Sequence, residues 1–395
     1  MYKRQERTLL FTDSNCSAYT TNFAVQKFQG GINISNFKVY DKAPDGTVGI
    51  YGVNEYSVFT QENDGVGNVP EGTSVRELKA NLNNPSQVLV SRDGKILADT
   101  DKVQNGDKIE YSGRILDWTV KTIAADEYAL RSIVGDALFE HCKLVGRQYY
   151  VENEGVSFEW TASNITLGGK MKGNVTAIID ADKMPAQDYS ETGINVVVDG
   201  DTANPKFIKL ESGVKSYTVA ENLSEGEHTL QIFKNAESIM SLFILKAIKF
   251  NGTPEKPADK THKIEFLGDS ITAGCGIKAS EPGDWMHFSY NTYASRTARM
   301  LDADYYCISN SGWGFARNLK DPTTINRIYE LTSDRRDGSL KWDFSWQPEL
   351  VVINLGTNDN FGLQNIKNPD LSALKEKYDA VSYTHLRAHE TLMNL

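Results

Sequence analysis

The chain has little positive charge and few cysteines, and each shortage excludes a class of protein. Its 395 residues contain 42 Lys and Arg against 52 Asp and Glu, a formal net charge of −10. Proteins that bind nucleic acid or anionic membranes neutralise phosphates with a basic surface, so neither partner is expected. The cysteines contain no CxxC pair, which argues against a zinc knuckle or a dense disulfide framework. They are Cys16, Cys142, Cys275 and Cys307.

Long apolar runs and a leader sequence are also missing. No run of about 18 apolar residues exists, and MYKRQERTLLFTDSN at the start lacks the apolar stretch and cleavage site of a secretory signal. MYKRQ and, near the end, SYTHLRAHET resemble translated sequencing-adapter read-through. We therefore expect an internal fragment in which residues 382–395 are a non-native tail.

The length predicts two to four domains. Residues 1–70 alternate short Val, Ile, Tyr and Phe runs with Gly, Asn and Asp clusters, which indicates a β-rich region of unknown role. Residues 71–139 are expected to form a small accessory module and its connection. There EGTSVRELKANL predicts a capped helical turn, and RDGK and QNGD are typical of hairpin turns. This module is similar to small modules appended to secreted bacterial enzymes that degrade polysaccharides.

Residues 140–251 read as strand after strand, for example INVVVDGD and GEHTLQIFK, with turn residues at the spacing of a sandwich. A two-sheet, jelly-roll-like β-sandwich is the predicted fold. The polar segment 252–262, which carries two prolines, is interpreted as a linker.

After the linker the pattern changes to strand, helix, strand. HKIEFLG, YCIS and LVVINL are short apolar strands, and NTYASRTARMLDADY and PDLSALKEKYDA are helical stretches. Near-continuous apolar strands separated by helices predict an α/β domain over 263–381 with a parallel sheet covered on both faces. Ligands bind beyond the carboxyl ends of such strands, where three glycine-bearing turns fall.

The first of these turns, EFLGDSITAGCG at 265–276, contains Ser270. It fits neither the G-x-S-x-G elbow of the α/β-hydrolases, because Thr272 replaces the second glycine, nor a phosphate loop or dinucleotide fingerprint. A serine at a strand end is more often a helix cap than a nucleophile. The other two turns change this balance. Gly312 in SNSGWG offers a backbone N–H and Asn358 in GTND a side-chain N–H, and with the Ser270 N–H they make three donors for the negative oxygen of acyl transfer.

GDSIT, the SG of SNSGWG and GTND resemble blocks I, II and III of the SGNH (GDSL) hydrolases, a serine-esterase family with a three-layer α/β fold. The resemblance implies that Ser270 is the nucleophile, that Gly312 and Asn358 complete the oxyanion hole, and that Asp269 supports the motif from behind. With the preceding sandwich, residues 140–381 resemble carbohydrate esterase family 2, whose members remove acetyl groups from plant cell-wall polysaccharides. This implies a secreted, extracellular acetylxylan-esterase-like enzyme acting on acetylated xylan or mannan, with no metal and no cofactor.

The histidine base of the family is missing from the native-looking sequence. Serine needs a positioned imidazole to take its proton, but only His385 and His389 follow GTND, and both lie in the predicted tail. DWMH, Asp284 to His287, fits the D-x-x-H pattern but precedes blocks II and III, so we interpret His287 as a loop histidine. The remaining histidines are expected to be structural: His141, His228 and His262.

Aromatic residues near these motifs offer a surface for sugars. Four tryptophans lie close to the motifs in sequence, and Trp313, between two glycines, is predicted to contact substrate. Two alternatives to a polysaccharide acetylesterase stay open. The first is a non-catalytic carbohydrate-binding fragment, and the second is an SGNH esterase or lipase acting on another ester.

Overall fold

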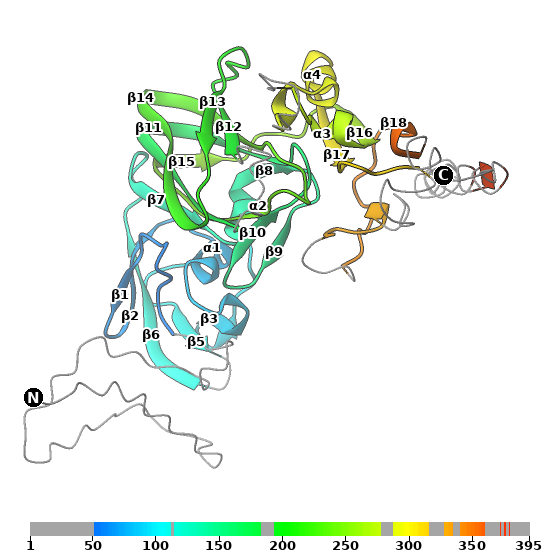
Figure 1. Cartoon of the computed structure of the whole chain (residues 1–395). Coiled ribbons are helices and arrows are strands. Elements are labelled where there is room, and N and C mark those ends of the chain that lie inside the picture. The colour runs from blue at the N-terminus through cyan, green and yellow to red at the C-terminus, as the bar shows by residue number, and fades with distance from the viewer. Residues whose placement is uncertain are drawn as a thin grey trace, which may run out of the picture. The chain divides into compact units, whose positions relative to one another are not determined.

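The structure is a computed structural model that describes residues 51–111, 114–182, 193–277, 287–315, 328–334 and 340–359, with single positions at 372, 375, 376 and 379. Figure 1 traces the chain, which divides into two compact units, 1–125 and 126–395. No helix among the described residues is long and apolar enough to cross a bilayer. Most of the predicted region 1–70, and the whole predicted tail 382–395, lie outside the described residues.

The first unit contains a six-stranded sheet in the order β1-β2-β6-β5-β3-β4. Its pairs are antiparallel except for β2 with β6, which are parallel. Aliphatic side chains of both predicted segments, such as Val66 and Ile109, share one buried core. The predicted boundary at 70/71 therefore falls inside a single sheet. The strands are β1 (Thr60–Glu62), β2 (Gly65–Pro70), β3 (Val88–Arg92), β4 (Lys95–Ile96), β5 (Lys108–Tyr111) and β6 (Arg114–Ile123).

Local signals in this unit hold. The predicted helical turn is α1 (Val75–Ala80), where the Ser74 hydroxyl accepts the Glu77 N–H as a cap. A short 3-10 helix, η1 (Pro85–Gln87), follows. RDGK joins β3 to β4 as an antiparallel hairpin. QNGD differs, because it precedes β5, and β5 pairs with β3 and β6 rather than with β4.

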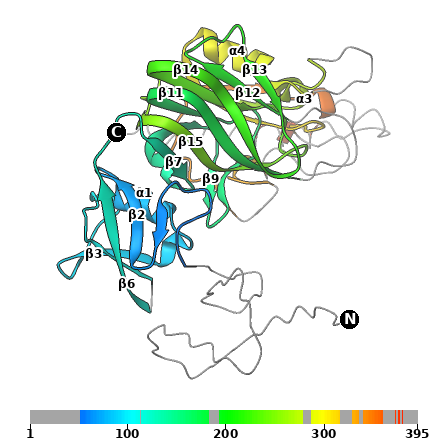
Figure 2. The ribbon, with the colours of Figure 1, turned by 90° about the vertical axis from the view of Figure 1, so that its left-hand side faces the viewer.

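The second unit begins with a nine-stranded sheet built on three long strands that lie side by side (Figure 1). The long strands twist together (Figure 2), and β11 bends at register shifts between Met171 and Thr176. The strands are β7 (Leu130–Val134), β8 (Cys142–Val145), β9 (Tyr149–Val151), β10 (Gly155–Phe158), β11 (Asn164–Ala181), β12 (Gly193–Val198), β13 (Lys206–Lys209), β14 (Gly213–Lys234) and β15 (Phe243–Glu255). A short helix, α2 (Ala137–His141), links β7 and β8.

All nine strands belong to one hydrogen-bonded network, because β11 and β15 change partners along their length. The strand pairing does not divide these nine strands into two separate sheets. The two-sheet jelly roll therefore stays a prediction. The limits also differ from the predicted 140–251. The sheet begins with β7 at Leu130 and runs to Glu255, which leaves only 256–261 as connection.

The α/β part contains the three predicted strands as a parallel sheet in the order β17-β16-β18. The strands are β16 (His262–Gly268), β17 (Ala303–Ser309) and β18 (Leu350–Asn354). Between β16 and β17 lie α3 (Ser270–Ala273), the 3-10 helix η2 (Ser289–Asn291) and α4 (Tyr293–Met300). The predicted helical stretch 291–305 contains α4, which begins at the Thr292 cap, but residues 303–305 belong to β17 instead.

Alternate residues of β16 pack in two different clusters. Phe266 packs with Ala294 and Ala298 of α4, whereas Leu267 packs with Trp313 and other side chains from beyond β17. Successive side chains of a strand point to opposite faces, so the two clusters cover the two faces of the sheet. This arrangement explains why the three strands lack polar alternation.

β18 is an edge strand of the described sheet, and Leu350 and Ile353 on it are 49% and 37% exposed. Apolar edge strands pair with other copies. We therefore expect the 395-residue chain to self-associate at micromolar concentration in sedimentation velocity, and Ile353→Lys to shift it toward monomer. A wild-type chain that stays monomeric at all concentrations would contradict this expectation.

Candidate active site

The three predicted turns lie at one edge of the parallel sheet. Gly268 of β16 is in register with Ser309 of β17 and with Asn354 of β18, so the three strands end at the same level. Ser270, Gly312 and Asn358 each follow one of these ends by two to four residues. The topology therefore gathers the three motifs that are separated by about ninety residues in sequence.

Ser270 is the first residue of α3, and it is not the cap of this helix. The cap is Asp269, whose Oδ1 accepts the Ile271 N–H at 2.9 Å. Asp269 therefore caps α3, and Ser270 does not serve as the helix cap. Gly268 permits the tight turn, because a Cβ there would lie 1.9 Å from the Thr272 hydroxyl oxygen. Ser270 is half-buried, with its position fixed by the turn on either side.

Gly312 and Asn358 are linked through the residue that follows Gly312. Gly312 has φ +82°, a conformation that favours glycine. The Asn358 Nδ2 donates to the Trp313 carbonyl at 2.7 Å and lies 3.4 Å from Asp269 Oδ2. One buried amide therefore contacts the neighbours of both Gly312 and Ser270, which brings the three turns together.

Buried carboxylates surround this amide. Asp269 and Asp359 are 1% and 3% exposed, and Asp359 Oδ2 accepts the Phe315 N–H at 2.7 Å. Burial raises the pKa of Asp269, the hydrogen bond from Ile271 opposes this, and the charges of Asp359 and Glu237 add to the rise. Asp269, which precedes Ser270, thus lies in an acidic setting.

His287 lies on the far side of the Gly312 turn. Its Nε2 is 3.4 Å from the Ser311 hydroxyl and 3.4 Å from Glu237 Oε1, and both ionisable side chains are fully buried. Burial lowers the pKa of His287, but contacts with Cys275 and Glu237 outweigh it and raise the pKa to about 9. A histidine that is protonated at neutral pH cannot accept a proton from serine. This pairing agrees with the interpretation of His287 as a loop histidine.

The His287–Glu237 pair gives stability a pH dependence. Because the folded pKa of about 9 exceeds the ordinary value of 6.5, the stabilisation is fully present below pH 6.5 and is lost as pH rises through 9. We expect His287→Gln to lower the free energy of unfolding by about 3 kcal/mol at pH 6 and by little at pH 9.5. Urea unfolding of both proteins at several pH values measures this difference, and a difference that does not change with pH would contradict it.

The other described histidines pair away from Ser270. His228 Nδ1 contacts Asp199 Oδ2 at 2.8 Å, and His262 Nδ1 contacts Glu349 Oε2 at 2.9 Å. His141 ends α2 in the nine-stranded part. His385 and His389 lie outside the described residues. Within the described part of the chain, no histidine is hydrogen-bonded to Ser270, and no group of three or more His, Cys, Asp or Glu could hold a metal ion.

Trp313 lies in the core and not on a surface. It is 6% exposed and packs edge to face on Trp160, with ring centroids 6.2 Å apart. A sugar needs an open ring face on which to stack, so the ring of Trp313 is not proposed as a platform. Its backbone carbonyl has the role that sequence reasoning missed, since it orients Asn358. Trp342 and Trp346 pack on Tyr306 of β17, and Trp285 lies outside the described residues.

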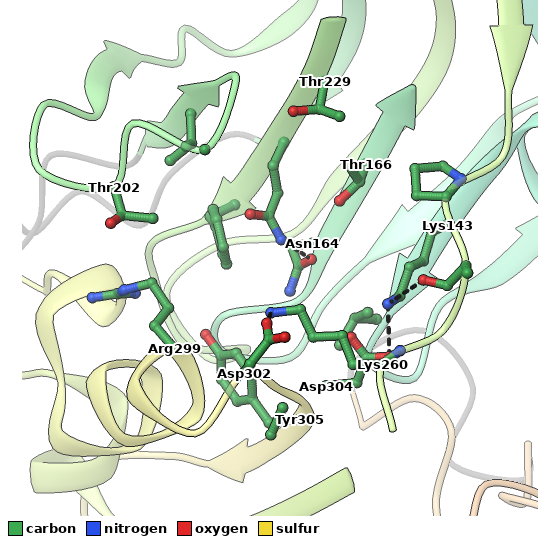
Figure 3. Close-up of a pocket in the computed structure, with 18 residues that line it drawn as sticks. Lys143, Asn164, Thr166, Thr202, Thr229, Lys260, Arg299, Asp302, Asp304 and Tyr305 are labelled. Atoms are coloured by element: carbon green, nitrogen blue, oxygen red, sulfur yellow. Dashed lines mark hydrogen bonds and ion pairs between the residues drawn. The ribbon is translucent and has the colours of Figure 1, made fainter. Parts of the chain in front are cut away.

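A cavity of about 380 Å³ lies at the opposite end of the sheet (Figure 3). It is at the start of β17, near Ala303, whereas Ser270 follows the carboxyl end of β16. Four of its five charged side chains form ion pairs, Lys143 with Asp304 and Lys260 with Asp302, at 2.7 Å each. None of the predicted site residues lines it, so the cavity is separate from the Ser270 site.

Comparison with known families agrees with this division of the second unit. Residues 144–257 match the family model "Carbohydrate esterase 2 N-terminal". Residues 266–389 match the "GDSL-like Lipase/Acylhydrolase family". The chain belongs to carbohydrate esterase family 2. The second match of this family 2 chain runs through His385 and His389, into the segment predicted to be a foreign tail.

Two curated proteins resemble the family 2 chain. It is 29% identical over 227 residues to the "Cellulase/esterase CelE" of Acetivibrio thermocellus, covering 54% of this chain and 26% of that protein. It is 31% identical over 150 residues to an "Acetylxylan esterase / glucomannan deacetylase" of Cellvibrio japonicus, covering 35% of this chain and 41% of that protein. The chain thus spans less than half of the length of these relatives.

Solved structures of family 2 esterases share its fold. The enzyme from Cellvibrio japonicus superposes with a TM-score of 0.58 at 23% identity over 66% of this chain and 76% of that chain. The enzyme from Clostridium thermocellum, solved in complex with cellohexaose, gives 0.54 at 26% identity over 63% and 74%. Residues 1–125 have no part in the matched families, and their role stays open.

Proposed function

We propose that the protein is a secreted serine esterase that removes acetyl groups from cell-wall polysaccharide of the xylan or mannan type. Ser270 is the nucleophile, and the N–H groups of Ser270, Gly312 and Asn358 form the oxyanion hole. The proposal rests on one observation. The Asn358 amide contacts Trp313, next to Gly312, and Asp269, next to Ser270, which supports a common site for the three donors.

The reaction follows from this arrangement. The Ser270 oxygen attacks the acetyl carbonyl carbon while a histidine base takes the hydroxyl proton, and the carbonyl oxygen becomes negative between the N–H donors. The same proton is returned to the departing sugar oxygen, which leaves an acetyl-serine. Water then attacks the acetyl-serine in the same way and releases acetate. We propose that the base comes from chain beyond the described residues.

The Asn358 amide has a hydrogen available for this role. Its hydrogen bond to the Trp313 carbonyl is short, whereas its contact with Asp269 is 3.4 Å, at the limit of a hydrogen bond. The short bond orients the side chain, and the second N–H is the one that turns toward substrate. The negatively charged oxygen of the tetrahedral intermediate competes well with Asp269 for this N–H of Asn358, because hydrogen bonds to charged groups are stronger.

The choice of substrate rests on likeness and charge. One similar protein is named for acetylxylan and glucomannan, and a similar structure was solved with cellohexaose. A net charge of −10 suits a neutral polysaccharide better than an anionic surface. The test is acetate release from acetylated xylan and from acetylated glucomannan. Release from neither, with good hydrolysis of a long-chain aryl ester, would favour a lipase-like role instead.

A non-catalytic carbohydrate-binding role is the alternative, and the cellohexaose complex of a similar structure favours it. Affinity electrophoresis in gels containing xylan or mannan separates the two functions. An esterase without a binding role migrates nearly as fast in the polysaccharide gel as in a gel without polysaccharide. Its Ser270→Ala variant shows the same migration. Strong retardation without any acetate release would identify a binding protein.

A further inference from the structure

A loop of the nine-stranded sheet reaches the turn that carries Gly312. Residues 235–242 connect β14 to β15, and there the Glu237 Oε2 accepts the Ser311 N–H at 2.5 Å. The next residue, Ser238, donates its hydroxyl to Asn310 Oδ1 at 2.9 Å. Glu237, Ser238 and Asn310 are completely buried. Two successive residues before Gly312 are therefore bound to the neighbouring domain.

His287 supplies the countercharge that this carboxylate needs. Burying an unpaired carboxylate is costly, and an imidazolium at 3.4 Å offsets the cost. The backbone around His287 is in turn fixed to the Ser270 turn, since His287 forms a β-bridge with Cys275 and the Phe288 N–H donates to the Gly274 carbonyl at 3.1 Å. Glu237 and His287 thus join the Ser270 turn, the Gly312 turn and the sheet domain.

This junction holds the two residues that precede Gly312. Gly312 has φ +82°. As a glycine it has no side chain that could hold this conformation. Binding the Ser311 N–H fixes the peptide plane immediately before Ser311, and binding the Asn310 side chain fixes the residue before that. Oxyanion donors act only when they are held in place before reaction, and a shift of about 1 Å costs about 10²-fold in rate.

We propose that Glu237 is a positioning residue for the esterase site: held by His287, it fixes the Ser311–Gly312 turn so that the Gly312 N–H meets the substrate oxygen. The inference rests on the proposed function. It gives the β-sheet domain a part in catalysis beyond any carbohydrate binding. It also predicts that the effect of Glu237 falls on kcat and not on KM, because the oxyanion exists only in the transition state.

Glu159 provides a matched control. It is another buried carboxylate of the same sheet domain, 1% exposed, and it accepts the Asp334 N–H at 2.6 Å and the Ser333 hydroxyl at 2.6 Å. Both carboxylates therefore bind backbone of the α/β part, but only Glu237 binds the turn before Gly312. A merely structural role would make the Glu237→Ala and Glu159→Ala variants alike.

The experiment compares kcat and KM of the complete, active protein with those of Glu237→Ala, Glu159→Ala and Ser270→Ala. We expect Glu237→Ala to lower kcat about 10- to 100-fold with KM within about twofold, and Glu159→Ala to leave kcat within about twofold. Equal kcat losses in both Glu variants, or no loss in Glu237→Ala, would overturn the positioning role. If Ser270→Ala kept its activity, the proposed function itself would fail, so the two failures are distinguishable.

Amide hydrogen exchange gives a second measurement, which needs no turnover. Glu237→Gln keeps an acceptor but loses its charge, and a charge-assisted hydrogen bond is about twice as strong as a neutral one. Even if Glu237→Ala does not fold, the peptide covering residues 306–315 should exchange faster in Glu237→Gln than in wild type, with no change in Glu159→Gln. Unchanged exchange in Glu237→Gln would contradict the proposal.

Discussion

Ser270→Ala is expected to reduce acetate release by a factor on the order of 10⁶ in kcat, as removal of the nucleophile does in a serine protease. The methyl group of alanine cannot attack a carbonyl carbon. The measurement is the steady-state rate on 4-nitrophenyl acetate and on acetylated xylan. It is made on an active form of the protein, either the 395-residue chain or a longer one.

Ser311→Ala is the matched control, because Ser311 lies beside the same site and contributes its backbone N–H, which alanine retains. Its hydroxyl contacts His287 at 3.4 Å, a distance at the limit of a hydrogen bond, so the rate should fall by less than about tenfold. A Ser270→Ala protein that keeps most of its activity would exclude the acyl-serine mechanism. A Ser311→Ala protein that loses as much as Ser270→Ala would show that the nucleophile is assigned to the wrong serine.

If residues 382–395 are the non-native tail predicted from the sequence, the 395-residue chain is expected to be nearly inactive, on the order of 10⁶ below a protein that contains the catalytic histidine. Three of its described histidines are paired elsewhere: His228 with Asp199, His262 with Glu349 and His287 with Glu237. Within the described residues no neutral imidazole is hydrogen-bonded to Ser270, and without one the hydroxyl stays protonated and attacks slowly. The same assays on both proteins measure the difference.

Activity of the 395-residue chain comparable to that of the completed protein would show that it contains its own base. The variants His287→Gln, His385→Gln and His389→Gln would then locate it. The last two are included because the matched family segment extends to residue 389. Loss of activity in His389→Gln alone would mean that residues 382–395 are native, contrary to our expectation.

Local patterns in the sequence predict the strands and the three motif turns well. HKIEFLG, YCIS and LVVINL fall in β16, β17 and β18, because each is an apolar run that ends in a glycine turn. Parallel pairing then forces their carboxyl ends to one edge, so motif order alone is enough to group Ser270, Gly312 and Asn358. These are properties of neighbouring residues, which a single sequence contains.

Contacts between distant segments cannot be predicted in this way. Glu237 is in a strand-connecting loop with no motif around it, and only the packing of two domains brings it to Ser311. The place of Trp313 between glycines suggests a substrate contact, but its ring turns into the core against Trp160. The single network of nine strands forms because β11 and β15 change partners midway, which alternating hydrophobicity does not reveal.

The central claim is that three N–H groups converge on one oxygen held next to Ser270. The most direct measurement is a crystal structure of the completed protein after inactivation by diethyl 4-nitrophenyl phosphate, which leaves a phosphoryl group on the nucleophile. We expect phosphorus on the Ser270 oxygen and one phosphoryl oxygen within about 3.2 Å of the nitrogens of Ser270, Gly312 and Asn358. Phosphorus on another residue, or a phosphoryl oxygen that faces solvent and touches none of these donors, would contradict the account.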